Sequence, residues 1–266
     1  MPRLNRTDAE RQLVQDAAPE FLEALARGLR VIEAFNRERR QLTLSDIARA
    51  VDLPRASVRR TLATLVQLGY AETDERLFRL TPRILSLASA YLSSNAISGI
   101  LQPAIERLSE EVAEGCSAAV RDGDDVIMIA HATPKRVIDV SAQIGLRLPA
   151  FASSLGRVLL AAFEDAALDD FLARIVPGKL TPATTIDKRV LRKAILKVRM
   201  DGFSYVDQEV EVGFRSISVP LKRLDGKVIA SLNIGAQSER CSAKTMLNVF
   251  LPKLRETADK LRQQLV

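Results

Sequence analysis

Two short segments of this 266-residue chain carry side chains whose types and spacing suggest chemistry. In the first, residues 54–69, arginine and hydroxyl side chains recur at helical spacing opposite an apolar face made of Val58, Leu62, Leu65 and Val66. An arginine side chain pairs with phosphate or with the O6 and N7 atoms of guanine. The segment therefore predicts a helix that binds duplex DNA. The simpler interpretation is a solvated basic face on a small helical domain.

The second segment is S-S-L-G-R at residues 153–157. Small residues at the start of a helix leave backbone N–H groups free to bind an anion, and the hydroxyls of Ser153 and Ser154 can add hydrogen bonds. We therefore expect a site for the carboxylate of a small organic acid. An ordinary helix N-cap packed against a sheet would give the same pattern.

Residues for catalysis are scarce. The single histidine, His131, ends the apolar run V-I-M-I-A, which is typical of a core or rim side chain. A Ser-His nucleophile also needs a carboxylate and an oxyanion hole, and no G-x-S-x-G turn surrounds the serine pair. The sequence also lacks the standard glycine-rich phosphate-binding motifs. We therefore expect no catalytic residue and no cofactor.

Metal and redox sites are not expected either. Cys116 and Cys241 are too few for a disulfide scaffold or a four-thiolate zinc site. Asp207, Glu209 and Glu211 alternate along the chain and allow a metal-binding interpretation. We expect instead that these three carboxylates are solvated charges of a loop.

The composition is that of a globular protein with a basic balance. Hydrophobic residues make up 47% of the chain and charged residues 27%, and the net charge is +6. No apolar stretch reaches the ~18–20 residues of a membrane-spanning helix, and the N-terminus lacks the apolar core of a secretion signal. We therefore expect a cytoplasmic protein with no membrane partner. Aromatic residues are only 5%, which disfavours single-stranded nucleic acid as the partner.

The elements around the arginine-bearing helix predict a winged helix-turn-helix. Apolar spacing indicates a first helix over 21–35, and Thr43 with Asp46 forms a capping pattern before a second, short helix. A tight turn leads into the helix over 54–69, and a hairpin over 70–80 supplies the wing.

The rest of the chain predicts an α+β domain with an antiparallel sheet. Strands are expected over 117–121, 126–132, 137–140, 204–207, 214–221 and 228–234. Helices are expected over 101–112, 153–163, 164–175, 188–201 and 244–264. The expected organisation is a flexible N-terminal segment (1–20), a DNA-binding domain (21–80), a connecting helix and linker (81–100) and a second domain (101–266).

The expected DNA contacts lie at the cap of the short helix, on the recognition helix and in the hairpin. They are Thr43, Ser45, Arg55, Ser57, Arg59, Arg60, Thr64, Arg76 and Arg79.

Five motifs extend over nearly the whole chain. They are R-G-L-R-V-I-E-A-F, L-S-D-I-A-R-A-V-D-L-P-R-A-S-V-R-R-T-L-A-T-L, G-L-R-L-P-A-F-A-S-S-L-G-R-V-L-L-A, D-G-F-S-Y-V-D-Q-E-V-E-V-G-F-R-S-I-S-V-P-L and G-K-V-I-A-S-L-N-I-G. In this order they resemble the IclR family of bacterial transcription regulators, in particular its β-ketoadipate (protocatechuate) branch. The resemblance implies a GAF-like effector-binding domain and dimers, or dimers of dimers, on pseudo-palindromic operators.

The resemblance also implies effector contacts. Matching the motifs residue by residue points to Ser154, Leu155, Asp207, Ser216, Asn233 and Gly235. Ser153 joins them through its hydroxyl, and Arg147 in G-L-R-L-P is the expected charge partner of the acid.

Together these features predict a ligand-responsive transcriptional regulator of a catabolic operon for aromatic acids. Its expected partners are double-stranded operator DNA, a small aromatic or dicarboxylic acid, further copies of itself, and RNA polymerase if it activates. Two other classes stay open. One is an enzyme with an appended DNA-binding head, and the other is a winged-helix architectural protein without a ligand.

Overall fold

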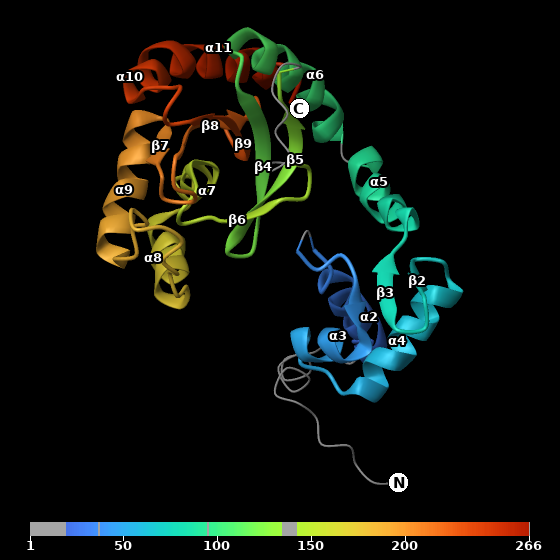
Figure 1. Ribbon diagram of the computed structural model, residues 1–266. Helices are drawn as coiled ribbons and strands as arrows, with labels where there is room; N and C mark the ends of the chain where they lie inside the picture. The colour runs from blue at the N-terminus through green and yellow to red at the C-terminus, as the bar shows by residue number, and fades with distance from the viewer. Residues whose placement is uncertain (1–19, 37, 95, 135–142, 266) are drawn as a thin grey trace. The chain divides into compact units, whose positions relative to one another are not determined.

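The computed structural model describes residues 20–36, 38–94, 96–134 and 143–265. The chain divides into two compact units, one ending at Tyr91 and the other beginning at Leu92 (Figure 1). This division falls inside the segment 81–100, where a connecting helix and linker are expected. The expected flexible segment 1–20 lies outside the described residues, except for Glu20.

In the part of the first unit that the structure describes, three helices pack together beside a small sheet. Its helices are α2 (Glu23–Glu33), α3 (Leu44–Ala50) and α4 (Arg55–Gln67), and its strands are β1 (Leu42–Thr43), β2 (Ala71–Thr73) and β3 (Leu77–Leu80). The sheet is antiparallel in the order β1-β3-β2. A 3-10 turn (Pro82–Ile84) and α5 (Leu85–Ser94) follow.

Local signals fix the helix boundaries of this unit. The Thr43 side chain accepts a hydrogen bond from the Asp46 backbone N–H while the Asp46 carboxylate accepts one from the Thr43 N–H, so the predicted capping box is present. Gly69, just past α4, has the left-handed φ of 77° that ends a helix. Strand β1 escaped prediction because it has only two residues, and one of them, Thr43, is the N-cap of α3.

The second unit is built on a six-stranded antiparallel sheet in the order β6-β5-β4-β9-β8-β7. The strands are β4 (Gly115–Asp122), β5 (Asp125–Ala132), β6 (Arg147–Pro149), β7 (Ser204–Asp207), β8 (Phe214–Lys222) and β9 (Val228–Gln237). The helices are α6 (Ala96–Val112), α7 (Ser154–Leu160), α8 (Asp165–Arg174), α9 (Lys188–Asp201), α10 (Ala243–Thr245) and α11 (Leu251–Arg262).

Helices cover both faces of this sheet (Figure 1). One hydrophobic cluster joins α6 and α11 to one face, and a second joins α7, α8 and α9 to the other. Successive strand residues point to opposite faces, so Ile217 and Val219 of β8 enter the first cluster, while Ser216 and Ser218 point toward α7. The predicted α+β class, with an N-terminal winged helix-turn-helix and an antiparallel sheet domain, is confirmed.

Three element predictions differ from the structure. The helix expected from residue 101 begins at Ala96, and strand β6 was not predicted. The closing helix expected over 244–264 is interrupted by a π-turn, Met246–Phe250, directly before α11. Pro252 explains the interruption, because proline has no N–H to complete the helical hydrogen bond of that turn. The strand expected over 137–140 lies outside the described residues.

No helix in the described ranges is long and apolar enough to cross a lipid bilayer.

Candidate DNA-binding surface and effector cavity

The predicted recognition helix α4 packs on α2 and α3 through one face only. Ile47 of α3 and Val58 and Leu62 of α4 are fully or almost fully buried. Arg30 of α2 donates a hydrogen bond to the carbonyl of Val51, which holds the turn that precedes α4. Burial of the apolar face leaves the opposite side of α4 to solvent, as docking in a major groove requires.

The arginines expected to contact DNA are exposed. Arg55, Arg59 and Arg60 all lie in the exposed class, and Arg60 shares the outermost side of α4 with Ala56 and Ala63. Ala56 and Ala63 have short side chains, so Arg60 is the long side chain of this outermost side, and it also lines the groove between α4 and α2. This is the geometry that a base-reading helix needs.

The predicted hydroxyl contacts are divided between other positions. Thr43 uses its hydroxyl to cap α3, and Ser45 is half-buried in the first turn of α3. Ser57 and Thr64 line a groove against α2, and the Thr64 hydroxyl donates to the Arg60 carbonyl. Ser57 and Arg59 lie about 160° apart around the helix axis, so they do not share one face as the sequence interpretation assumed.

The wing carries two of the predicted arginines. Arg76 is exposed in the turn between β2 and β3. Arg79 faces Glu72 across the β2–β3 ladder and donates to its carboxylate at 2.7 Å. Glu72 therefore partly neutralises Arg79, whereas no ion pair is recorded for Arg76 in the described part of the chain.

Six of the predicted effector residues meet in the second unit, around one cavity of about 60 Å³ between the sheet and the start of α7. The lining residues are Gly115, Ser117, Met128, His131, Leu148, Ser153, Ser154, Leu155, Val206, Val210, Phe214, Ser216, Asn233 and Gly235. The cavity is thus built from segments that are far apart in the sequence.

One wall of the cavity is a cluster of buried polar side chains. The Ser154 hydroxyl lies 2.8 Å from that of Ser216 and 2.7 Å from that of Ser218. The Asn233 amide donates to the hydroxyls of Ser154 and Ser218, each at 3.2 Å. Ser153 caps α7 by accepting from the Gly156 N–H. Hydroxyl and amide donors gathered in this way can bind an organic anion.

The remaining walls combine apolar side chains with a histidine. Met128, Leu148, Val206 and Val210 supply apolar surface. The His131 Nδ1 atom lies 2.9 Å from the Ser117 hydroxyl. The hydrogen bonds of Ser153 and Ser154 go to other groups. The serine that contacts His131 is therefore Ser117, and neither member of the predicted serine pair does so.

Two predicted effector residues lie outside this lining. Arg147 is an exposed residue of β6 that binds Asp122 at 2.7 Å and Asp125 at 3.2 Å. The pairing of β6 with β5 thus places Arg147 beside surface carboxylates and outside the lining of this cavity, although it was expected to be the charge partner of the acid.

Asp207 is likewise held by its neighbours. It accepts a hydrogen bond from the Tyr205 hydroxyl at 2.9 Å and lies 3.3 Å from the Arg215 guanidinium. Burial, together with the hydrogen bond to Asp207, raises the pKa of Tyr205 to about 12. Asp207 thus belongs to a polar cluster at the edge of the sheet and does not line the cavity.

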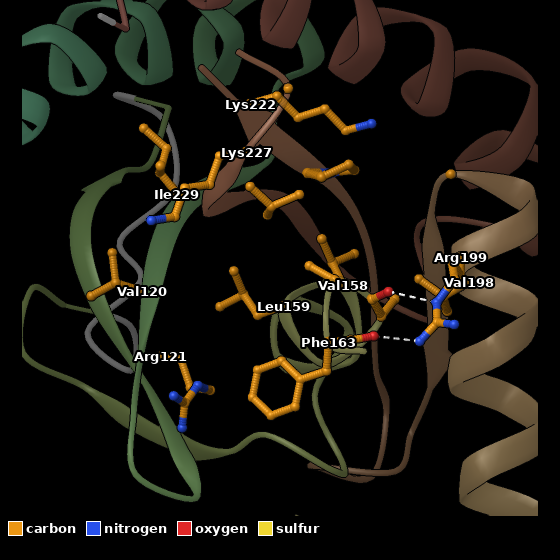
Figure 2. Close-up of a pocket in the computed structure, with 16 residues that line it drawn as sticks. Val120, Arg121, Val158, Leu159, Phe163, Val198, Arg199, Lys222, Lys227 and Ile229 are labelled. Atoms are coloured by element: carbon orange, nitrogen blue, oxygen red, sulfur yellow. Dashed lines mark hydrogen bonds between the residues drawn. The ribbon is translucent and has the colours of Figure 1, made fainter. Parts of the chain in front are cut away.

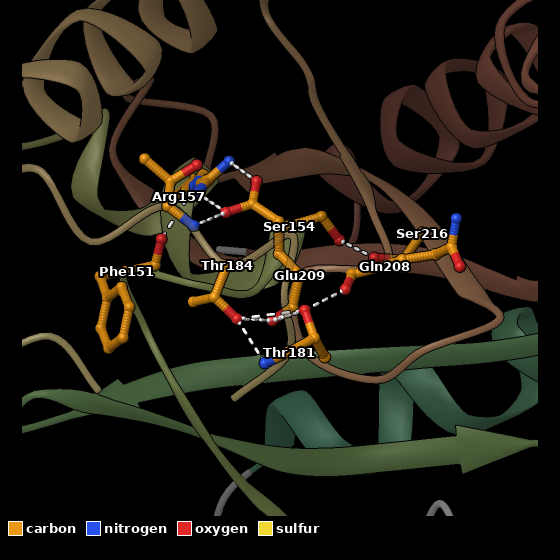
Figure 3. A network of polar contacts seen from close by, with 9 residues as sticks. Phe151, Ser154, Arg157, Thr181, Thr184, Gln208, Glu209 and Ser216 are labelled. Atoms are coloured by element: carbon orange, nitrogen blue, oxygen red, sulfur yellow. Dashed lines mark hydrogen bonds and ion pairs between the residues drawn. The ribbon is translucent and has the colours of Figure 1, made fainter. Parts of the chain in front are cut away.

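Sequence reasoning missed the polar network beside the cavity (Figure 3). Arg157 of α7 binds Glu209 through two hydrogen bonds of 2.7 and 2.8 Å, and its Nε–H donates to the Phe151 carbonyl. Glu209 also accepts from the Thr185 N–H. The interpretation of Glu209 as a solvated loop charge was wrong, since the residue is 9% exposed. No group of residues in the described ranges has the composition of a metal site.

A second, larger cavity of about 690 Å³ lies near the end of α7 (Figure 2). Arg121 and Phe163 are drawn at one side of it and Lys222 and Lys227 at the other. None of the predicted effector residues lines it. Size alone therefore does not identify the effector site.

Family models match both units. The model described as the IclR helix-turn-helix domain matches residues 24–75, and the one described as the bacterial transcriptional regulator IclR C-terminal domain matches residues 89–263. A DNA-binding head joined to a ligand-binding domain defines a one-component transcription regulator. The chain belongs to the IclR family of bacterial transcriptional regulators.

Individual relatives and a solved structure agree with this placement. The chain is 40% identical to the Pca regulon regulatory protein of Pseudomonas putida, over 99% of this chain and 91% of that protein. It is 33% identical to the p-hydroxybenzoate hydroxylase transcriptional activator of Acinetobacter baylyi, over 91% of this chain and 92% of that protein. The crystal structure of an IclR homolog complexed with 4-hydroxybenzoate from Microbacterium hydrocarbonoxydans matches this chain with a TM-score of 0.75 and 28% sequence identity. The match covers 91% of this chain and 98% of that one.

Proposed function

We propose that this chain is a transcriptional regulator of an operon for aromatic-acid catabolism and that an aromatic or dicarboxylic acid of that pathway is its effector. The observation that carries the proposal is the cavity in which Ser154, Ser216 and Asn233 form a buried polar wall opposite apolar side chains. The names of the relatives, a Pca regulon protein and a p-hydroxybenzoate hydroxylase activator, support the choice of pathway.

The chemistry of the cavity lining suits a ring that carries a carboxylate. The carboxylate accepts hydrogen bonds from the Ser154 and Ser216 hydroxyls and from the Asn233 amide, and the ring contacts Met128 and Val210. The regulator responds only if the acid binds the DNA-competent and DNA-incompetent states with different affinity. Closing the polar cluster around a carboxylate is a change that can supply this difference.

The DNA-binding unit acts as a homodimer in this proposal. Leu22, Leu25 and Leu29 of the α2 region are 49–69% exposed, and Leu25 and Leu29 line an apolar groove of about 620 Å³ with Leu68 and Leu87. Exposed apolar surface of this kind marks an interaction site. A two-fold dimer sets two recognition helices about one turn of DNA apart on a pseudo-palindromic operator, and the dimers can pair further. The protein acts in the cytoplasm, and RNA polymerase is a partner if it activates.

The enzymatic and architectural alternatives are not favoured by any specific observation in the described residues. An enzyme needs a nucleophile or a metal. The Ser154 hydroxyl at the cavity binds Ser216, Ser218 and Asn233, Ser153 caps α7, and Ser117 is the serine beside His131. A purely architectural protein has no need of a cavity with a buried polar wall.

A thermal-shift panel tests the proposal. The purified chain is heated with 4-hydroxybenzoate, protocatechuate, β-ketoadipate and unrelated acids, and hits are repeated in gel shifts with promoter DNA from the neighbouring genes. A ligand at 100 times its Kd stabilises the folded state by about 2.7 kcal/mol, which a thermal shift detects. If no acid of the panel changes either the melting temperature or the DNA affinity, the proposal fails.

A further inference from the structure

The effector cavity is too small for the acids that the proposed function requires. Its volume is about 60 Å³. For comparison, an engineered cavity in an apolar protein core that binds benzene has a volume of ~150 Å³. A hydroxybenzoate is larger than benzene, so a part of the wall must move before the acid binds.

Most of the wall is fixed by hydrogen bonds. Strands β4, β9 and β8 each pair with a neighbour on both sides, which fixes Ser117, Asn233 and Ser216. The start of α7 is tied to the sheet through Ser154 and its bonds to Ser216 and Ser218. A side chain that can turn without breaking these bonds is the simplest source of space for a larger ligand.

Phe214 is the bulkiest side chain of the lining and meets this requirement. It is the first residue of β8 and follows Gly213, whose φ of 81° turns the chain into the strand. The residue is half-buried, so it is not enclosed on every side. A rotation about its side-chain bonds moves the ring and leaves the strand in place.

The ring occupies the space above Gly235. A Cβ atom built on Gly235 would lie 2.3 Å from the Phe214 Cζ and 3.1 Å from its Cε1. The geometry follows from strand register, since Ser216 pairs with Gly235 and Phe214 lies two residues along the same face of β8. The φ of Gly235 is not left-handed, so the ring, and not the backbone, is what excludes a side chain at this position.

We propose that the Phe214 ring is the movable wall of the effector cavity and sets the size of the acid that the protein accepts. The inference rests on the proposed function, namely that this cavity binds the acid. A phenyl ring is about the size of benzene, so its departure from above Gly235 supplies the volume that the cavity lacks. The ring then borders the bound acid, and a smaller residue at 214 admits a larger ring.

The test compares two acids that differ only in the size of the ring system, 4-hydroxybenzoate and 6-hydroxy-2-naphthoate, by calorimetric titration of the full chain. Wild type is expected to prefer 4-hydroxybenzoate. Phe214→Ala is expected to bind the naphthoate at least about tenfold more tightly than wild type does and 4-hydroxybenzoate more weakly. If Phe214 had a purely structural role, the substitution would weaken the binding of both acids to the same extent. Phe163→Ala, at the other cavity, is the matched control and should keep the wild-type ratio.

A double-mutant cycle provides a readout without ligand. Gly235→Ala should lower the melting temperature of the wild type by a small but measurable amount, because the new methyl group forces the ring out of its position above Gly235. In the Phe214→Ala background the same change should cost little. Equal losses in both backgrounds would overturn the assignment of the ring to this position.

The outcomes separate the two proposals. If wild type binds 4-hydroxybenzoate and Phe214→Ala keeps the wild-type ratio of affinities, the inference about Phe214 fails and the proposed function stands. If neither acid binds wild type or Phe214→Ala, the proposed function fails for aromatic acids, and the size role fails with it.

Discussion

Arg157 and Glu209 form a buried two-point ion pair, with guanidinium–carboxylate distances of 2.7 and 2.8 Å. Their side chains are only 6% and 12% exposed. The pair joins α7, whose start lines the effector cavity, to the connection between β7 and β8, which contributes Val210 to the same cavity. Thr181 and Thr184 add hydrogen bonds to the backbone of this connection (Figure 3).

Removing one charge of this pair should destabilise the second unit strongly. Glu209→Gln leaves the Arg157 guanidinium buried without its counter-charge, and breaking such pairs costs about 3–5 kcal/mol. Urea unfolding measures the loss. The matched control is Asp169→Asn, which breaks the exposed pair with Arg192 and should cost no more than ~1 kcal/mol. Equal stability of the two variants would contradict a structural role for the buried pair.

Substitution of the exposed arginines on α4 should weaken operator binding. Arg59→Ala or Arg60→Ala is expected to cost about 1–3 kcal/mol if the side chain reads a base. Gel shifts with the operator measure the change. Arg174→Ala, which removes an exposed arginine of the second unit, controls for the loss of one positive charge. Unchanged affinity in both α4 variants would count against docking of this helix face on DNA.

Blocking the polar wall should uncouple the ligand response from DNA binding. Ser154→Leu removes the hydroxyl that binds Ser216 and Ser218 and places an isobutyl group at the cavity wall. We expect DNA affinity without ligand to be retained and the effect of the acid on the gel shift to be lost. Ser154→Ala, which removes only the hydroxyl, should give an intermediate response. A normal response in Ser154→Leu would exclude Ser154 from the effector site.

Loss of the α3 cap should destabilise the DNA-binding unit in a pH-dependent way. Thr43→Ala removes the cap of α3, and such a loss costs about 1 kcal/mol at neutral pH. The hydrogen bonds from the Thr43 side chain and backbone hold the pKa of Asp46 below its ordinary value of 3.8. Since the folded-state pKa is the lower one, this stabilisation is present above pH 3.8 and is lost as the pH falls through the lowered value.

Thermal unfolding of wild type and Thr43→Ala at pH 7, 5 and 3 measures this effect. The difference between the two proteins should be largest at pH 7 and 5 and smaller at pH 3. A difference that is independent of pH would mean that the Asp46 carboxylate takes no part in the cap.

Features set by neighbouring residues were readable from the sequence. The capping pair Thr43 and Asp46 predicted the start of α3, and Gly69 predicted the end of α4. Helix α9 was predicted with its observed bounds, Lys188–Asp201, with Gly202 as its end. The structure adds that the Asp187 side chain caps its start. Signals of this kind act over three or four residues and need no tertiary contact.

The cavity required more than local signals. Ser154 and Ser216 are 62 residues apart and Ser154 and Asn233 are 79 apart, so their contact depends on how α7 packs on strands β8 and β9. Their candidacy came from the family motifs, and their hydrogen bonds only from the structure. The Arg157–Glu209 pair could not be predicted for the same reason, because its two residues are 52 apart in the sequence.

The sequence by itself determined the winged helix-turn-helix, the α+β class and the family, because caps, turns and apolar periodicity are encoded within single elements. Tertiary structure alone decided which charges are buried, which serines meet and which face of α4 each side chain occupies. Arg147 and Glu209 illustrate the difference. Arg147 was expected at the effector site and is exposed, whereas Glu209 was expected in solvent and is buried. A charged side chain carries no local sign of its burial, which is set by the strands and helices that pack around it.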